Sequence, residues 1–117
     1  MPFKFEKLLV WQKALDLTDY VHELTKSFPK TEIFSLTSQI NRAADSVSLN
    51  IAEGSTGQTN PEFSRFLNIA LRSNIEVVGC IHIAIRRKLI SKEEFDKIYS
   101  MCEEILVMIN GLKNSLK

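Results

Sequence analysis

Residues 32–76 read EIFSLTSQINRAADSVSLNIAEGSTGQTNPEFSRFLNIALRSNIE, and this stretch decides the fold. In each half, apolar residues recur at intervals of three and four, which is the spacing of one face of a helix. The small, polar residues 55–59 separate the two halves and indicate a loop. The stretch therefore predicts two consecutive amphipathic helices.

The ends of these two helices carry recognisable signals. The first helix is predicted over about residues 32–53, and Gly54 is a typical C-terminal stop. The second is predicted over about residues 60–88, where Asn60 can cap the first turn and Pro61 suits the first helical position. The apolar face of the first helix comprises Ile33, Leu36, Ile40, Ala43, Ala44, Val47 and Ile51.

Two further helices flank this pair. One is predicted over about residues 8–28 and ends where a proline follows, because the residue before proline disfavours helical geometry. The other begins at Ser91, which forms a capping box with Glu94. Only residues 89–90 separate it from the preceding helix, so these two helices should be antiparallel neighbours. The predicted fold class is an all-α, up-down-up-down four-helix bundle, with residues 1–117 forming one domain.

Composition and charge narrow the classes of function. The chain has 117 residues, of which 44% are hydrophobic and 25% charged, as is typical of one compact globular domain. The formal net charge is +1, so a nucleic-acid role must depend on a local basic patch. Two cysteines do not make a disulfide framework, which favours a reducing cytoplasm. Charges interrupt the apolar residues of the N-terminus, so we expect neither a signal peptide nor a membrane span.

Polar residues form a second row beside the apolar face of the helix over residues 32–53. They fall within about a 60° sector at the margin of the core, and polar residues of the next helix occupy a similar margin. The two rows can form a hydrogen-bonded seam, line a polar ligand groove, or be solvated surface. The seam is the simplest interpretation, because buried polar groups must be satisfied. The residues are Gln39, Ser46, Asn50, Glu53, Ser73 and Glu76.

The helix over residues 60–88 is the most basic element, with five basic residues against two acidic ones. One interpretation is a phosphate-binding stripe, which an oligomer would multiply into a ring. Another is a solvated face with ion pairs. Arginine is also favoured in protein interfaces, so its presence does not discriminate between the two kinds of partner. The candidate nucleic-acid-binding residues are Arg65, Arg72, Arg86, Arg87 and Lys88.

Apolar residues outside the predicted core are candidates for contacts between subunits. Ile69 and Ile83 lie on the outer side of the basic helix, and Trp11 and Leu15 form a second row on the first helix. An equally good interpretation of the latter pair is that the N-terminal arm covers it with its phenylalanines. Asn74 lies within the apolar face of the basic helix, and we expect it to find a partner on a neighbouring helix.

No motif for a catalytic, metal or cofactor site is present in the sequence. Cys80 and His82 are two residues apart, so on a helix their side chains point about 200° apart and cannot bind one metal ion. His22 is alone on its helix, and no set of nucleophile, base and orienting residue is found. We therefore expect a protein that is not an enzyme and binds no cofactor.

Several short segments together match a known family: residues 10–12 with Ala14, 28–29 with Glu32, 36–40, 42–44, 50–54, 62–63, 66–67 and 69–70, with Ser46, Ser73 and Glu76. The chain is similar to the bacterial four-helix-bundle family of proteins encoded within 23S rRNA intervening sequences, often labelled as ribosomal proteins. More distantly, it resembles the accessory variability protein of diversity-generating retroelements. The family commonly has proline, glycine and an apolar residue where this chain has Ser48, Arg72 and Asn74.

The resemblance implies a small cytoplasmic bundle that assembles into a ring-like homopentamer. For the retroelement relatives it also implies binding to a reverse transcriptase and to nucleic acid through a basic surface. Our first hypothesis is a non-enzymatic, homo-oligomeric bundle that binds structured RNA or a ribonucleoprotein partner. The alternative is a protein-interaction scaffold without nucleic-acid contact. A third hypothesis, an enzyme or small-ligand binder, has only the polar row in its favour.

Overall fold

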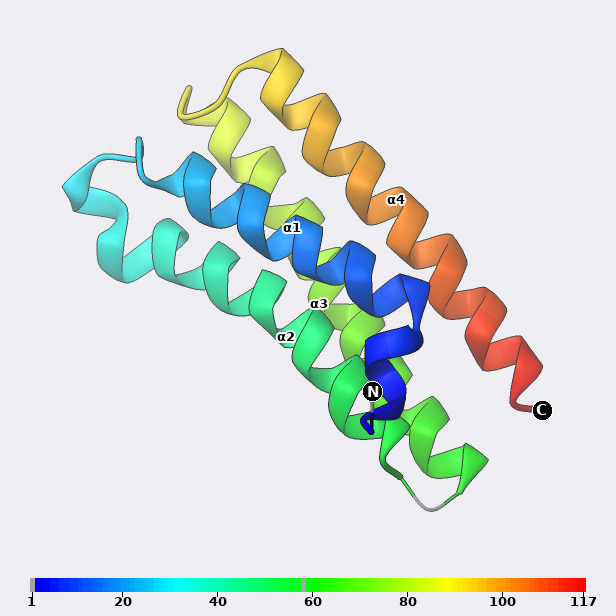
Figure 1. The fold of residues 1–117 in the computed structure, drawn as a ribbon. Coiled ribbons are helices and arrows are strands. Elements are labelled where there is room, and N and C mark those ends of the chain that lie inside the picture. Colours follow the sequence, from blue (N-terminus) through cyan, green and yellow to red (C-terminus); the bar gives the residue numbers. More distant parts are fainter. Residues whose placement is uncertain (1, 58) are drawn as a thin grey trace.

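The computed structural model describes residues 2–57 and 59–117, and Figure 1 shows its helical architecture. Gln58, in the predicted loop, lies outside the described residues. A 3-10 turn, η1 (Lys4–Lys7), precedes the first long helix, and a second 3-10 turn, η2 (Lys30–Glu32), and a π-helical turn, η3 (Ile33–Thr37), precede the second. The four long helices are α1 (Leu9–Thr25), α2 (Ser38–Ser55), α3 (Asn60–Arg86) and α4 (Lys92–Ser115).

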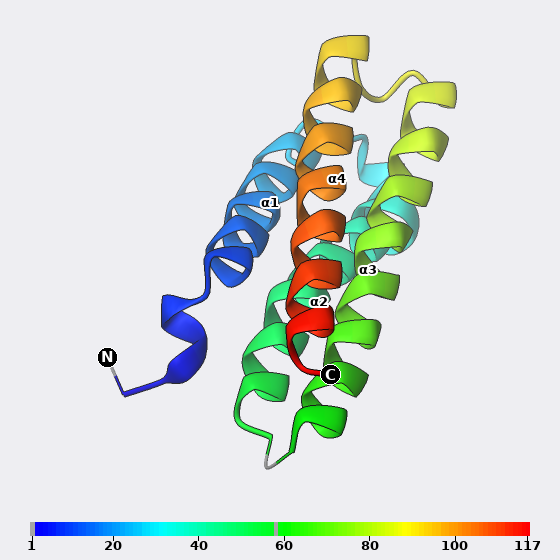
Figure 2. The ribbon, with the colours of Figure 1, turned by 90° about the vertical axis from the view of Figure 1, so that its right-hand side faces the viewer.

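The four helices run alternately up and down along a molecule of 43 × 22 × 22 Å. Each helix packs against the next in the chain, and α1 also packs against α4, so the helices occupy the corners of a square. The α1–α2 and α3–α4 connections lie at one end, and the α2–α3 connection lies at the other (Figures 1 and 2). The predicted all-α, antiparallel four-helix bundle is confirmed, because the described residues contain no strand.

The core lies where the apolar faces of the four helices meet. The three-four pattern of α1 is buried along its length, and equivalent rows of the other helices are packed against it. In the buried row of α3, Asn74 is a polar residue among apolar ones, and only 2% of its surface is exposed. The fully buried large side chains include Leu17, Ile40, Ile51, Leu67, Ile81, Ile98, Ile105 and Ile109.

Gly54 has a different role from the predicted one. It lies inside α2 with a negative φ, and the helix continues to Ser55 with Thr56 as its C-cap. A Cβ atom at Gly54 would lie 2.5 Å from the Cβ of Phe66 and 3.1 Å from Cδ1 of Phe63. The glycine is therefore needed because α3 approaches the α2 backbone here, and the prediction that it stops the helix is wrong.

The entry to α2 is not regular α-helix. Residues 33–37 form a π-helical turn, and Ile33, assigned to the core face, is 44% exposed there. The wider π turn changes the angular step per residue, so the three-four pattern does not extend into it. At the start of α3 the cap is Thr59, not Asn60, because the Thr59 hydroxyl accepts the backbone N–H of Glu62.

By length and hydropathy, α3 meets the criterion for a membrane-crossing helix. This is weak evidence, because the central helix of a packed bundle passes the same test. In this fold α3 lies against α2 and α4, and its outer face carries arginines. We therefore interpret its apolar residues as part of the bundle core.

Candidate functional site

Polar residues of α2 and α3 meet between the two helices. The Asn50 amide donates to the Ser46 hydroxyl at 2.9 Å and to the Ser46 carbonyl at 2.8 Å. The Ser73 hydroxyl donates to the same Ser46 oxygen at 2.9 Å, across the helix interface. Further along the interface, two turns before Ser46 and one turn after Ser73, the Gln39 amide donates to the Glu76 carboxylate at 3.2 Å. Five of the six residues predicted for the polar row are thus brought together.

A shallow groove of about 290 Å³ lies over this seam. Arg42 lines its edge and forms no ion pair within residues 2–57 and 59–117. Glu53 is exposed at the far end of α2, and its side chain bonds no described residue, so it does not join the seam. The seam residues bond mainly to one another, both along α2 and across to α3, which favours a packing role over ligand binding.

Three arginines form a stripe along the outer face of α3. Arg65 and Arg72 are seven residues apart, and Arg86 follows fourteen residues later, so all three side chains leave the same side of the helix. All three residues are exposed. Arg65 lies over the Phe66 ring at 4.6 Å, and none of the three forms an ion pair with the described residues. We call Arg65, Arg72 and Arg86 the arginine stripe.

The other two predicted basic residues do not belong to the arginine stripe. The Arg87 guanidinium pairs with the Glu32 carboxylate at 2.9 Å and ties the end of α3 to the turn before α2. A hydrogen bond from Ser35 and the positive charge of Arg87 both lower the pKa of Glu32. Lys88 leaves the helix in the left-handed region, at φ 60°. Of the five predicted nucleic-acid-binding residues, the structure thus aligns three on one side of α3, and Arg87 and Lys88 lie apart from them.

The predicted subunit-contact residues lie in two separate places. Trp11 is half-buried, with the Phe5 ring packed edge-on at 4.8 Å, so the N-terminal arm covers it in part. Leu15 is exposed on α1, whereas Ile69 and Ile83 are exposed on α3, at the diagonal corner of the bundle. The four residues cannot form one continuous patch on a single protomer.

The buried polar atoms of the core are partly satisfied. The Asn74 amide donates to the Cys102 carbonyl of α4 at 2.8 Å, but its Oδ1 has no partner among the described residues. Burial, together with the Glu76 charge, raises the pKa of Cys80 to about 11, and burial raises that of Cys102 to about 12. Both thiols are therefore protonated at neutral pH and are poor nucleophiles.

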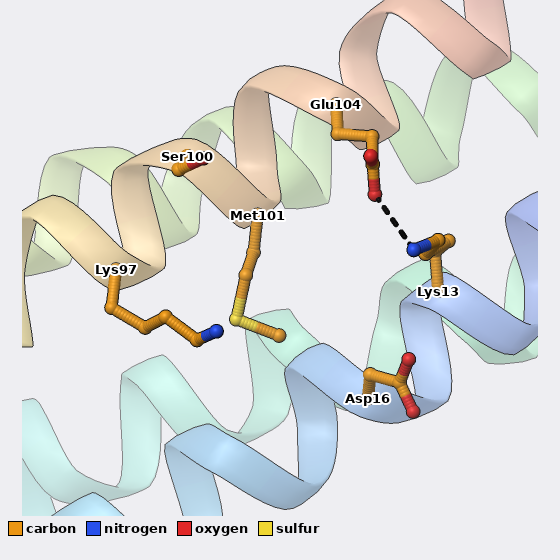
Figure 3. Close-up of a pocket in the computed structure, with 6 residues that line it drawn as sticks. All are labelled: Lys13, Asp16, Lys97, Ser100, Met101 and Glu104. Atoms are coloured by element: carbon orange, nitrogen blue, oxygen red, sulfur yellow. Dashed lines mark ion pairs between the residues drawn. The ribbon is translucent and has the colours of Figure 1, made fainter.

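A polar cleft between α1 and α4 was not anticipated from the sequence. Figure 3 shows its lining, with the Met101 side chain reaching toward α1 and the Lys13 ammonium 3.2 Å from the Glu104 carboxylate. The cleft has a volume of about 420 Å³. The positive charge of Lys97 on α4 lies across it from the negative charge of Asp16 on α1. Mixed charges on separate helices leave no signal in the sequence, and they select no single class of ligand.

No group of three or more His, Cys, Asp or Glu side chains could hold a metal ion within residues 2–57 and 59–117. His82 packs edge-on against Phe95 of α4, with the ring centres 5.0 Å apart. This histidine therefore helps to hold the α3–α4 pair together.

The fold, the α2–α3 seam and the arginine stripe define a small antiparallel four-helix bundle with a polar helix interface and a basic outer face. The family model described as 23S rRNA-intervening sequence protein matches residues 6–111, and the chain belongs to this family. The family resemblance inferred from the sequence is thereby confirmed.

The fold is also similar to a crystal structure from Bacteroides thetaiotaomicron VPI-5482. That protein has unknown function and belongs to the S23 ribosomal protein family. The two share 24% identity over 90% of this chain and 98% of that chain, with a TM-score of 0.81. At this identity the likeness concerns the fold alone. The comparison with curated proteins gave no match.

Proposed function

We propose that this protein is a non-enzymatic, homo-oligomeric bundle in the cytoplasm that binds structured RNA, alone or within a ribonucleoprotein. The observation that carries the proposal is the arginine stripe, whose three guanidinium groups are exposed and lack carboxylate partners among the described residues. Arginine binds phosphate oxygens with two parallel hydrogen bonds, so a row of unpaired arginines suits a nucleic-acid backbone.

The length of the stripe suits an extended polyanion. Arg65 and Arg86 are separated by 21 residues, which is about 30 Å along the helix axis. Gly79 lies on the same side between Arg72 and Arg86, and a Cβ there would meet no atom within 4 Å. The centre of the stripe is therefore open to close approach by a partner.

Assembly would multiply a modest charge. One protomer has a formal net charge of only +1, and its stripe supplies three unpaired cations. A ring of identical protomers would repeat the stripe around its circumference and increase the number of phosphates contacted at once. The family resemblance to a ring-like homopentamer and the exposed Leu15, Ile69 and Ile83 support an oligomer.

The experiment is a binding titration with a labelled RNA hairpin at low salt, followed by fluorescence anisotropy. The triple variant Arg65→Ala, Arg72→Ala, Arg86→Ala should bind at least tenfold more weakly than the unmodified protein. The matched control removes three exposed lysines from other surfaces: Lys7→Ala, Lys97→Ala, Lys117→Ala. Equal losses in both variants, or no binding by the unmodified protein, would contradict an RNA site on α3.

A second candidate function is a protein-interaction scaffold without RNA. The observation in its favour is that Ile75 and Ile83, 57% and 44% exposed, flank the arginine stripe on α3. Mixed apolar and arginine surfaces are common in protein interfaces. Recovery of one defined protein partner from a nuclease-treated lysate, lost on Ile83→Asp, together with no RNA binding at low salt, would favour the scaffold.

A further inference from the structure

The π-helical turn before α2 presents a phenylalanine to solvent. Phe34 is 98% exposed, and its neighbour Ile33 is 44% exposed, whereas Leu36 of the same turn is buried. Single exposed apolar residues are common on protein surfaces. Phe34, however, lies in a π-helical turn, and such turns are rare and frequently found at functional sites.

This turn is held firmly in place. The Glu32 carboxylate accepts the Ser35 hydroxyl at 2.7 Å and pairs with Arg87 at 2.9 Å. The pair joins the turn to the end of α3, so the α1–α2 and α3–α4 connections form one end surface of the bundle (Figure 2). Phe34 is therefore displayed by an anchored turn, beside the basic end of α3.

Lys88 occupies an unusual backbone position at the same end. The Leu89 N–H donates to the Ala84 carbonyl and the Lys88 N–H to the Ile85 carbonyl, which is the hydrogen-bond pattern of a Schellman motif. The residue in the left-handed conformation of this motif is usually glycine, yet here it is Lys88 at φ 60°. An exposed lysine in this strained conformation marks the position as a candidate functional residue.

The charge balance of this end leaves basic groups unpaired. Two of its acidic residues are neutralised within the protomer, since Glu32 pairs with Arg87 and Asp96 pairs with Lys92. The cations without an ion-pair partner among the described residues are Lys30, Arg86 and Lys88, against the acids Glu93 and Glu94, of which Glu94 caps α4.

We propose that Phe34 is a stacking platform for an unpaired nucleobase, with Lys30 and Lys88 contacting the phosphates beside it. Aromatic side chains within basic surfaces bind unpaired bases in this way, because every base has a π face. Arg86, the last residue of the arginine stripe, precedes Arg87, which pairs with Glu32 of the turn, so the stripe runs toward this end of the bundle. The inference rests on the proposed function and names its target: a duplex on the stripe that ends in an unpaired loop at Phe34.

The experiment compares an RNA hairpin carrying a uridine loop with a blunt duplex of the same stem. Phe34→Ala should weaken hairpin binding by about tenfold or more and leave duplex binding unchanged. Phe34→Trp should retain hairpin binding, because indole also stacks. Leu49→Ala is the matched control, since Leu49 is 65% exposed on α2 and should not affect either RNA. Lys88→Gly should raise the melting temperature and weaken hairpin binding.

The outcomes separate this inference from the proposed function. If the arginine-stripe variant loses binding but Phe34→Ala binds the hairpin normally, the function stands and the stacking platform is refuted. If Phe34→Ala leaves RNA binding unchanged but reduces the oligomer mass, Phe34 is a protein contact and the inference fails. If the unmodified protein binds neither RNA, both proposals fail.

Discussion

At the scale of single residues, Gly54 is where α2 and α3 come closest in this part of the bundle. The ideal Cβ position at Gly54 lies 2.5 Å from the Cβ of Phe66, which is closer than two carbon atoms can approach. Each Cβ atom is bonded directly to the backbone of its own helix, so a side-chain rotation cannot relieve the contact. Gly54 is therefore required for the close packing of α3 against α2.

We predict that Gly54→Ala lowers the free energy of unfolding by about 1–3 kcal/mol, because it forces α3 away from α2. Urea denaturation followed by circular dichroism measures the change. Gly111→Ala is the control, since a Cβ at Gly111 would meet nothing within 4 Å. That substitution should stabilise α4 by about 0.5–1 kcal/mol. A stable Gly54→Ala variant would mean that the two helices are not so closely packed.

The residue patterns explain which features could be predicted from the sequence. The apolar face of α1 and the capping box at Ser91 follow from local sequence patterns, and both are present in the structure. The predictions for Gly54 and Ile33 are wrong. The role of Gly54 depends on its contact with α3, which is distant in sequence, and the exposure of Ile33 depends on the π-helical turn. The separation of Arg87 from the arginine stripe depends on Glu32, which is 55 residues away.

At the scale of helices, the polar seam joins α2 to α3, the two helices to which most of residues 32–76 belong. Asn50 bridges the backbone and hydroxyl of Ser46, and Ser46 in turn accepts the Ser73 hydroxyl. Helical spacing alone indicates that the two rows can face each other. Which donor meets which acceptor depends on the axial register of the two helices, and no local sequence pattern specifies this.

We predict that Asn50→Ala lowers the free energy of unfolding by about 1–3 kcal/mol, because it removes two hydrogen bonds from a half-buried position. Thermal or urea unfolding provides the measurement. Glu53→Ala, one turn further along the same helix, should have almost no effect, since its side chain bonds no described residue. Equal stability of the two variants would argue against a structural role for the seam.

The ion pair at the bundle end predicts a pH-dependent stability. The Ser35 hydrogen bond and Arg87 lower the pKa of Glu32 below its ordinary value of 4.5. A lowered folded-state pKa contributes stability above the unfolded-state value, and this contribution disappears as pH falls through the folded-state value. Glu32→Gln should therefore lower the melting temperature at neutral pH, with a gap that closes in acid. A gap that is constant from neutral pH into acid would contradict this role.

At the scale of the whole molecule, the bundle has chemically distinct surfaces around one core. The arginine stripe lies on the outer face of α3, and the mixed-charge cleft lies between α1 and α4 (Figure 3). The exposed apolar residues Leu15 and Ile83 occupy diagonal corners. The Leu15 corner of one protomer and the Ile83 corner of the next are different surfaces, so a contact between them would be head-to-tail. Such a contact closes into a ring when the rotation between neighbours permits it.

We predict that native mass spectrometry detects a closed oligomer, which for a pentamer is five copies of the 13.4 kDa chain. Leu15→Asp and Ile83→Asp should each reduce the mass to that of one chain while the circular dichroism spectrum stays helical. Both residues are exposed, so neither substitution introduces a charge into the core. A single-chain mass for the unmodified protein at micromolar concentration would refute assembly.

The salt dependence of RNA binding tests the central claim most directly. The logarithm of the binding constant for an RNA hairpin should fall linearly with the logarithm of salt concentration, because bound cations displace counterions from phosphates. Removing the three residues of the arginine stripe should reduce this slope by roughly three per protomer engaged. A slope that is the same for the variant and the unmodified protein would contradict phosphate binding by the stripe.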